Sequence, residues 1–62
     1  MNLLDWCLTL DPLEQTYVRQ CVQYWNGVNG GIEPDIPEGM SKAHAMTLKY
    51  HAFSLNNGKK DD

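Results

Sequence analysis

Residues 11–27 read DPLEQTYVRQCVQYWNG, and this stretch decides the fold. It opens with a helix start: Asp11 can accept hydrogen bonds from the exposed amides of a first turn, and Pro12 suits the first helical position. Glu14 stands where a capping box places an acidic side chain. A helix is therefore expected to begin at Pro12.

The apolar residues that follow recur with the period of an α-helix. They cover about half of the helical wheel, and polar side chains occupy the other half. The apolar set is Leu13, Tyr17, Val18, Cys21, Val22, Tyr24 and Trp25. Gly27 is typical of the left-handed residue that terminates a helix. The pattern predicts an amphipathic helix over residues 12–26.

A second helix is predicted on the N-terminal side, over residues 2–10. Asn2 is a suitable N-cap for it. Asp5 and Thr9 interrupt an otherwise wide apolar arc. The arc is formed by Leu3, Leu4, Trp6, Cys7, Leu8 and Leu10. We expect this short helix to be largely buried.

Residues 27–39 are predicted to be a loop without regular structure. The stretch 26–39 holds four of the five glycines, two of the three prolines and two Asn-Gly pairs, a composition that breaks helices and strands. Val28, Ile32 and Ile36 recur every four residues. We expect these three side chains to hold the loop against the core, and the loop could contain a short turn of helix near Pro37.

The last predicted element is a helix over residues 40–55. Ser41 is a reasonable N-cap, and Asn57-Gly58 is a reasonable stop. Residues 46–52 also alternate apolar and polar side chains, which is the period of a strand. We favour a helix because the rest of the sequence offers no partner strand.

Together these elements predict an all-α fold, a small three-helix domain. The single domain would span residues 1–57, with a flexible C-terminal tail over residues 58–62. A chain of 62 residues buries only about 60% of the surface that its unfolded form exposes. Domains of this size usually need a disulfide, a metal, oligomerisation or very good helix packing. A homodimer is one of these solutions.

Charge and cysteine content exclude several classes of protein. The formal net charge is −3, and residues 1–39 hold six acidic side chains against Arg19 alone. Nucleic-acid binding is therefore unfavourable, because it depends on basic charge. A secreted domain of this size would carry more than two cysteines, the N-terminus lacks the features of a signal peptide, and no apolar stretch could span a membrane. We expect a cytoplasmic protein in which Cys7 and Cys21 are buried thiols, with a disulfide between them as the alternative.

No catalytic nucleophile stands out in the sequence. Ser41 is interpreted as a helix cap, and Ser54 lies late in the last helix, outside any G-x-S-x-G turn. Both cysteines fall on apolar helix faces, where a buried thiol is inert. We predict that the chain is not an enzyme.

Metal and cofactor sites are not expected either. His44 and His51 share a stripe of the last helix, but seven residues span about 10 Å, too far for one ion. The acidic residues Glu33, Asp35 and Glu38 lack the order of a calcium-binding loop. We predict no metal and no cofactor.

The last helix carries two apolar seams, where a surface helix needs only one. The first, which we call the bulky seam, consists of Ala43, Met46, Tyr50 and Phe53. The second, the small seam, lies about 160° away around the wheel and consists of Ala45, Leu48, Ala52 and Leu55. His44 and His51 lie between the seams on one side, where protonation near pH 6.5 would change the charge at the rim.

We expect the bulky seam to pack against the aromatic face of helix 12–26. The small seam has the alternation of Ala and Leu that suits close approach by another helix. A partner or a second copy could cover it, and its four residues would then form the candidate interface together with His44 and His51. Alternatively, helix 2–10 covers the small seam within the same chain.

These features favour a small acidic protein-binding module. It would be an adaptor, an inhibitor or a regulatory factor that packs a helix onto a protein partner or onto itself. A larger, basic partner would meet a candidate acidic contact loop formed by Glu33, Asp35 and Glu38. One alternative is a dimeric DNA-binding transcriptional regulator that uses the last helix. Another is a structural subunit of a larger complex.

Overall fold

The computed structural model describes residues 2–58, which form three α-helices. Helix α1 spans Leu3–Leu8, α2 spans Pro12–Trp25 and α3 spans Lys42–Gly58. A short 3₁₀ helix, η1, spans Val28–Gly31. The predicted all-α, three-helix fold is confirmed. The apolar alternation at residues 46–52 lies within a helix, and no strand forms in the described part of the chain.

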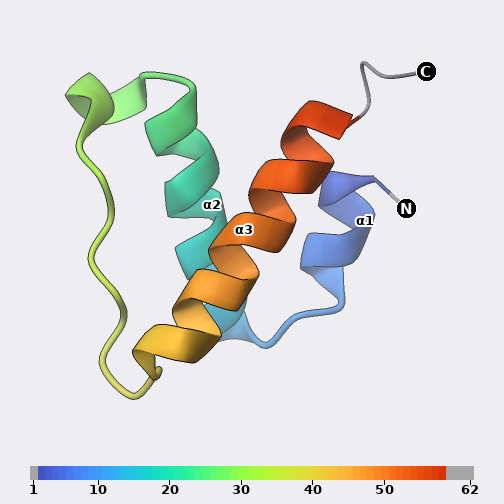
Figure 1. Ribbon diagram of the computed structural model, residues 1–62, viewed down its shortest axis with the longest axis vertical. Helices are drawn as coiled ribbons and strands as arrows, with labels where there is room; N and C mark the ends of the chain where they lie inside the picture. Colours follow the sequence, from blue (N-terminus) through green and yellow to red (C-terminus); the bar gives the residue numbers. More distant parts are fainter. Residues whose placement is uncertain (1, 59–62) are drawn as a thin grey trace.

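Helix α3 lies across α2 and passes beside α1 (Figure 1). The shortest extent of the molecule is 18 Å, which leaves room for two layers of helices at their usual spacing of about 8–10 Å. One layer holds α1 and α2, and the other holds α3. Helix α3 therefore covers the α1–α2 pair from one side only.

Each helix begins at the cap that the sequence predicts. The side chain of Asn2 accepts a hydrogen bond from the Asp5 amide at 2.8 Å, and Ser41 Oγ accepts from the His44 amide at 3.1 Å. Asp11 and Glu14 form a capping box at the start of α2. These local interactions fix where the three helices start.

The ends of two helices differ from the prediction. Helix α1 stops at Leu8 because the chain turns at Thr9, whose amide and hydroxyl both donate to the carbonyl of Trp6. Helix α3 continues to Gly58 instead of ending near residue 55. The predicted flexible tail lies, from residue 59 onward, outside the described residues.

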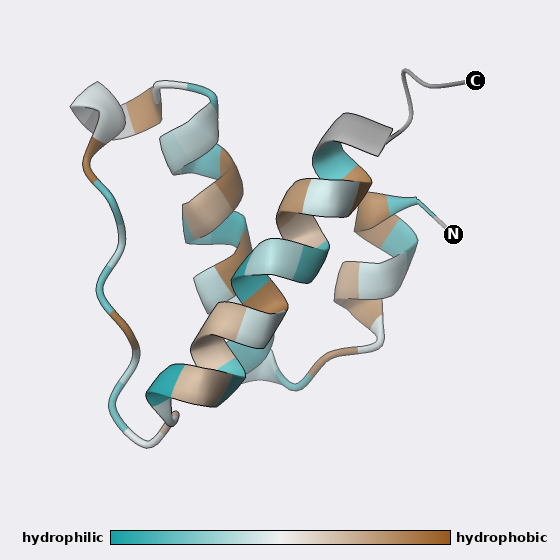
Figure 2. Ribbon diagram, viewed as in Figure 1, coloured by the Kyte–Doolittle hydropathy of each residue, from teal (hydrophilic) through white to brown (hydrophobic). Residues whose placement is uncertain are grey.

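The connection between α2 and α3 contains more structure than expected. Gly27 adopts a φ of 77°, the left-handed conformation expected of a helix terminator, and the 3₁₀ helix η1 follows at once. The prediction that the loop is held by its spaced apolar residues is wrong. Val28, Ile32 and Ile36 are all exposed, and Figure 2 shows apolar segments along this connection. A salt bridge from Lys49 of α3 to Glu33 ties the loop down instead.

The core is built mainly from small side chains. Its buried members come from all three helices: Cys7, Tyr17, Val18, Cys21, Ala45, Leu48 and Ala52. Partly buried neighbours close its edges: Leu3, Trp6, Leu10, Val22, Trp25 and Met40. Both cysteines are free thiols, which agrees with the prediction of two buried thiols.

The structure reverses the predicted roles of the two seams of α3. The small seam faces the core, whereas Ala43 and Tyr50 of the bulky seam are exposed. Only Phe53 keeps the predicted aromatic contact, meeting Trp25 edge to face with ring centroids 5.1 Å apart. Because α3 must contact α1 and α2 together, the face between its two neighbours is buried. Alanines there let the helix backbones approach closely.

Candidate interaction surface

Three of the residues predicted to meet a partner lie in the chain's own core. Ala45 and Ala52 are 0% exposed and Leu48 is 6% exposed, while Leu55 is half-buried. The proposal that a partner covers the small seam is therefore corrected. The alternative holds: α1 and α2 cover this seam within the same protomer.

The two histidines that flank the small seam contact other helices of the same chain. His44 Nε2 lies 2.5 Å from Oε2 of Glu14, which joins the first turns of α3 and α2. The ring of His51 packs against the indole of Trp6, with centroids 4.6 Å apart. The hydrogen bond from His44 is the main cause of a lowered pKa of Glu14, and a second one from the Asp11 amide adds to it.

A second contact joins α3 to the loop, and its two charged groups lie near the buried Cys21 of α2. Lys49 pairs with Glu33, and this hydrogen bond raises the pKa of Lys49. Burial is the main cause of a raised pKa of both the Tyr17 phenol and the Cys21 thiol. A thiol with a raised pKa in a closed core is a poor nucleophile.

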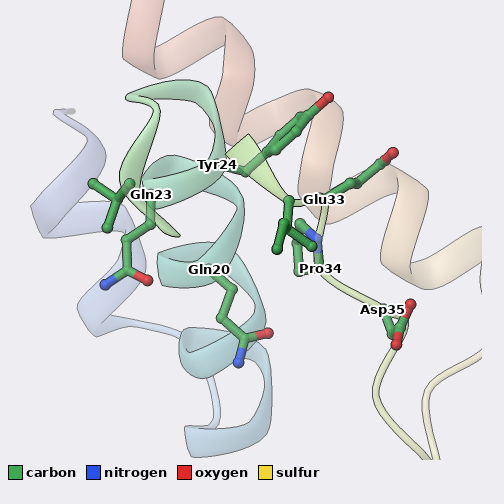
Figure 3. Close-up of a pocket in the computed structure, with 8 residues that line it drawn as sticks. Gln20, Gln23, Tyr24, Glu33, Pro34 and Asp35 are labelled. Carbon is green, nitrogen blue, oxygen red and sulfur yellow. The ribbon is translucent and has the colours of Figure 1, made fainter. Parts of the chain in front are cut away.

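The predicted acidic contact loop is partly engaged within the chain. Glu33 pairs with Lys49, whereas Asp35 and Glu38 are exposed. A hollow of about 500 Å³ lies between this loop and α2, lined by Gln20, Gln23, Tyr24, Val28, Ile32, Glu33, Pro34 and Asp35. Figure 3 shows Tyr24 of α2 and Glu33 of the loop extending in the same direction.

A second, more apolar groove separates α1 from α2. Its walls are Leu3, Leu4 and Cys7 of α1 facing Val18 and Val22 of α2, with Arg19 and Gln23 at the α2 rim, and its volume is about 290 Å³. Leu4 is 64% exposed and Leu8, one turn further along α1, is 60% exposed. The groove and this leucine ridge lie on the side of the α1–α2 layer that α3 leaves open.

The prediction that the N-terminal helix is largely buried, made because most of its residues are apolar, is wrong: Cys7 is buried, whereas Leu4 and Leu8 are exposed. A six-residue helix with one neighbouring layer can bury only part of its circumference, so some of its leucines must face outward. The signal that could have revealed this is the i, i+4 spacing of Leu4 and Leu8, which places both side chains on one face.

Within residues 2–58, no three side chains of His, Cys, Asp or Glu are grouped so that they could hold a metal ion. No helix in that part of the chain has the length and apolar character needed to cross a bilayer. Comparisons with protein-family models, curated proteins and solved structures find no match. Function is therefore inferred from the surface of this chain alone.

Proposed function

We propose that this chain is a non-enzymatic, cytoplasmic protein-binding module that acts as an adaptor, an inhibitor or a regulatory factor. The observation that carries the proposal is the leucine ridge of Leu4 and Leu8 beside the apolar α1–α2 groove. The core encloses alanines and cysteines, while these two large side chains face solvent. Burial of apolar surface contributes about 25 cal/mol per Å², so a partner that covers the ridge gains free energy that the monomer leaves unused.

The positions of the reactive groups support a binding role over a catalytic one. Cys7 and Cys21 are enclosed in the core, and the Ser41 hydroxyl oxygen caps α3. Neither thiol shares a described hollow with a histidine that could serve as its base. Ser41 does lie near His44, in an open depression of the surface. A cap oxygen that already accepts the His44 amide is poorly placed for nucleophilic attack.

The experiment is affinity capture from a lysate of the source cells, with the bound proteins identified by mass. The bait is the tagged chain, and the matched bait carries Leu4→Ser and Leu8→Ser. A control bait carries Ile32→Ser, which also removes an exposed apolar side chain. The proposal expects proteins that the chain and the Ile32 variant retain and the double variant loses. Equal capture by all three baits would show that the ridge is not a binding surface.

The DNA-binding alternative gains no support from the geometry of α3. Lys49 pairs with Glu33, and His44 pairs with Glu14. Two of the side chains that would contact DNA phosphates therefore already lie next to carboxylates, which would repel a phosphate. A gel shift at low salt with nonspecific DNA tests this alternative directly.

A further inference from the structure

The open side of the α1–α2 layer has a defined order of chemical groups. At 100° per residue, α1 presents Leu4 about 60° from the buried Cys7, Leu8 about 100° from it and the exposed Asp5 about 160° from it. On α2, Val22 lies about 40° from the buried Val18, and Arg19 at the rim lies about 100° from it. Across the face, the features therefore follow in this order: the acidic Asp5, the Leu4–Leu8 ridge, the apolar groove and the basic Arg19.

We infer that this face binds a second copy of the same chain, through a two-fold interface in which the Leu4–Leu8 ridge of each protomer enters the α1–α2 groove of the other. The inference rests on the proposed function, because it names the partner of the same surface. A two-fold axis brings a patch against itself, so the patch must be complementary to its own rotated image.

The order of features on this face meets that requirement. Rotation by 180° about an axis that lies in the interface and runs along the groove reverses this order, so the ridge of one protomer faces the groove of the other, and the groove faces a ridge. The same rotation places Asp5 of one protomer opposite Arg19 of the other, twice per dimer. Arg19 is the one cation among residues 1–39, and it stands at the rim of this groove. A partner whose charges are all of one sign would be attracted to only one edge of the face, either to Asp5 or to Arg19.

The size of the face indicates a modest affinity. Stable interfaces bury about 600 Å² or more on each partner. An interface of that size would take a large share of this chain's accessible surface of 4420 Å². The face is formed by a six-residue helix and one side of α2. We therefore expect a dimer that dissociates on dilution, with a dissociation constant of roughly micromolar order.

The test is sedimentation equilibrium of the full chain over a wide range of concentration, combined with charge reversal. Asp5→Lys and Arg19→Glu each create like-charged pairs across the two-fold axis, and each should raise the dissociation constant about tenfold or more. An equimolar mixture of the two variants contains only opposite pairs in the mixed dimer. The mixture, and the chain that carries both changes, should return close to the wild-type value.

Two further variants serve as controls. Asp35→Lys and Lys42→Glu make the same changes in net charge at exposed positions away from this face, and both should dimerise like the wild type. Circular dichroism checks that every variant is folded, and restoration by mixing is itself possible only if both single variants fold.

Three results would overturn the inference: a wild-type chain that stays monomeric throughout, single variants that associate as the wild type does, or a mixture that remains monomeric. None of these results decides the proposed function, which the affinity-capture experiment tests separately. Capture of another protein that depends on Leu4 and Leu8, by a chain that does not self-associate, would mean that the surface is a binding site with a different occupant.

Discussion

The carboxylate of Glu14 and the imidazole of His44 lie 2.5 Å apart, although thirty residues separate them in the chain. The contact joins the N-terminal turn of α2 to that of α3 at the end of the molecule where the long connection arrives. Glu14 also accepts a hydrogen bond from the Asp11 amide. One side chain thus caps its own helix and positions the next one.

This contact predicts a dependence of stability on acid. The pKa of Glu14 is lowered below its usual value of 4.5, chiefly by the hydrogen bond from His44. A carboxyl group whose folded-state pKa is depressed stabilises the fold above its unfolded pKa, and this contribution is lost as the pH falls through the folded value. Glu14→Gln keeps an acceptor for the Asp11 amide but cannot ionise. The variant should unfold more easily than the wild type above pH 4.5, and the difference should narrow below it.

Urea unfolding at a series of pH values measures this effect. Glu38→Gln, at an exposed position in the loop, is the matched control and should follow the wild-type curve. If the difference between wild type and Glu14→Gln is constant down to strongly acidic pH, the Glu14–His44 pair is not formed in solution.

The packing of α3 predicts opposite outcomes for the same substitution at two of its alanines. Ala52→Leu adds three carbon atoms at a position with no exposed surface and should destabilise the fold by about 1–3 kcal/mol. Ala43→Leu makes the same change at an exposed position of the bulky seam, and its effect should stay within about 0.5 kcal/mol. Chemical denaturation gives both free energies of unfolding. The reverse order of effects would mean that the bulky seam, and not the small one, faces the core.

The Lys49–Glu33 salt bridge predicts a change in dynamics more than in stability. Its carboxylate partner is about half exposed, and pairs of this kind contribute less than about 1 kcal/mol. Lys49→Met keeps the apolar stem of the side chain and removes the link to the loop. Backbone order parameters from NMR should fall at residues 32–35, with little change in the free energy of unfolding. Lys42→Met is the control, and equal order parameters in all three proteins would argue against the link.

The buried cysteines predict slow chemical modification of the folded chain. Cys21 has no exposed surface and Cys7 is nearly as enclosed, and burial raises the pKa of the Cys21 thiol. Both thiols should react with a small alkylating reagent far more slowly in buffer than in concentrated urea. Mass spectrometry after timed labelling gives the two rates. Rapid labelling of Cys21 in buffer would contradict the closed core.

Local chemistry made the helices predictable from the sequence. The caps at Asn2, Asp11 and Ser41 each act within one turn of their own position, so their effect does not depend on the rest of the fold. The left-handed Gly27 is equally local. These positions fix where each of the three helices begins and where α2 ends.

The buried face of α3 and the interaction surface could not be predicted in the same way. Both seams have helical spacing, and the choice between them depends on where α1 lies relative to α2. The short turn at Thr9 ends α1 early and leaves Leu4 and Leu8 facing outward. The sequence pattern predicts apolar faces, whereas the placement of whole helices decides which face is covered.

The most direct test of this account is an isotope-filtered NOE experiment on an equimolar mixture of ¹³C-labelled and unlabelled chain, at a concentration where it self-associates. We predict intermolecular contacts from the methyl groups of Leu4 and Leu8 to those of Val18 and Val22. The absence of intermolecular contacts at these methyls, or their appearance only along the exposed seam of α3, would contradict the claim that the open α1–α2 face is where this protein meets its partner.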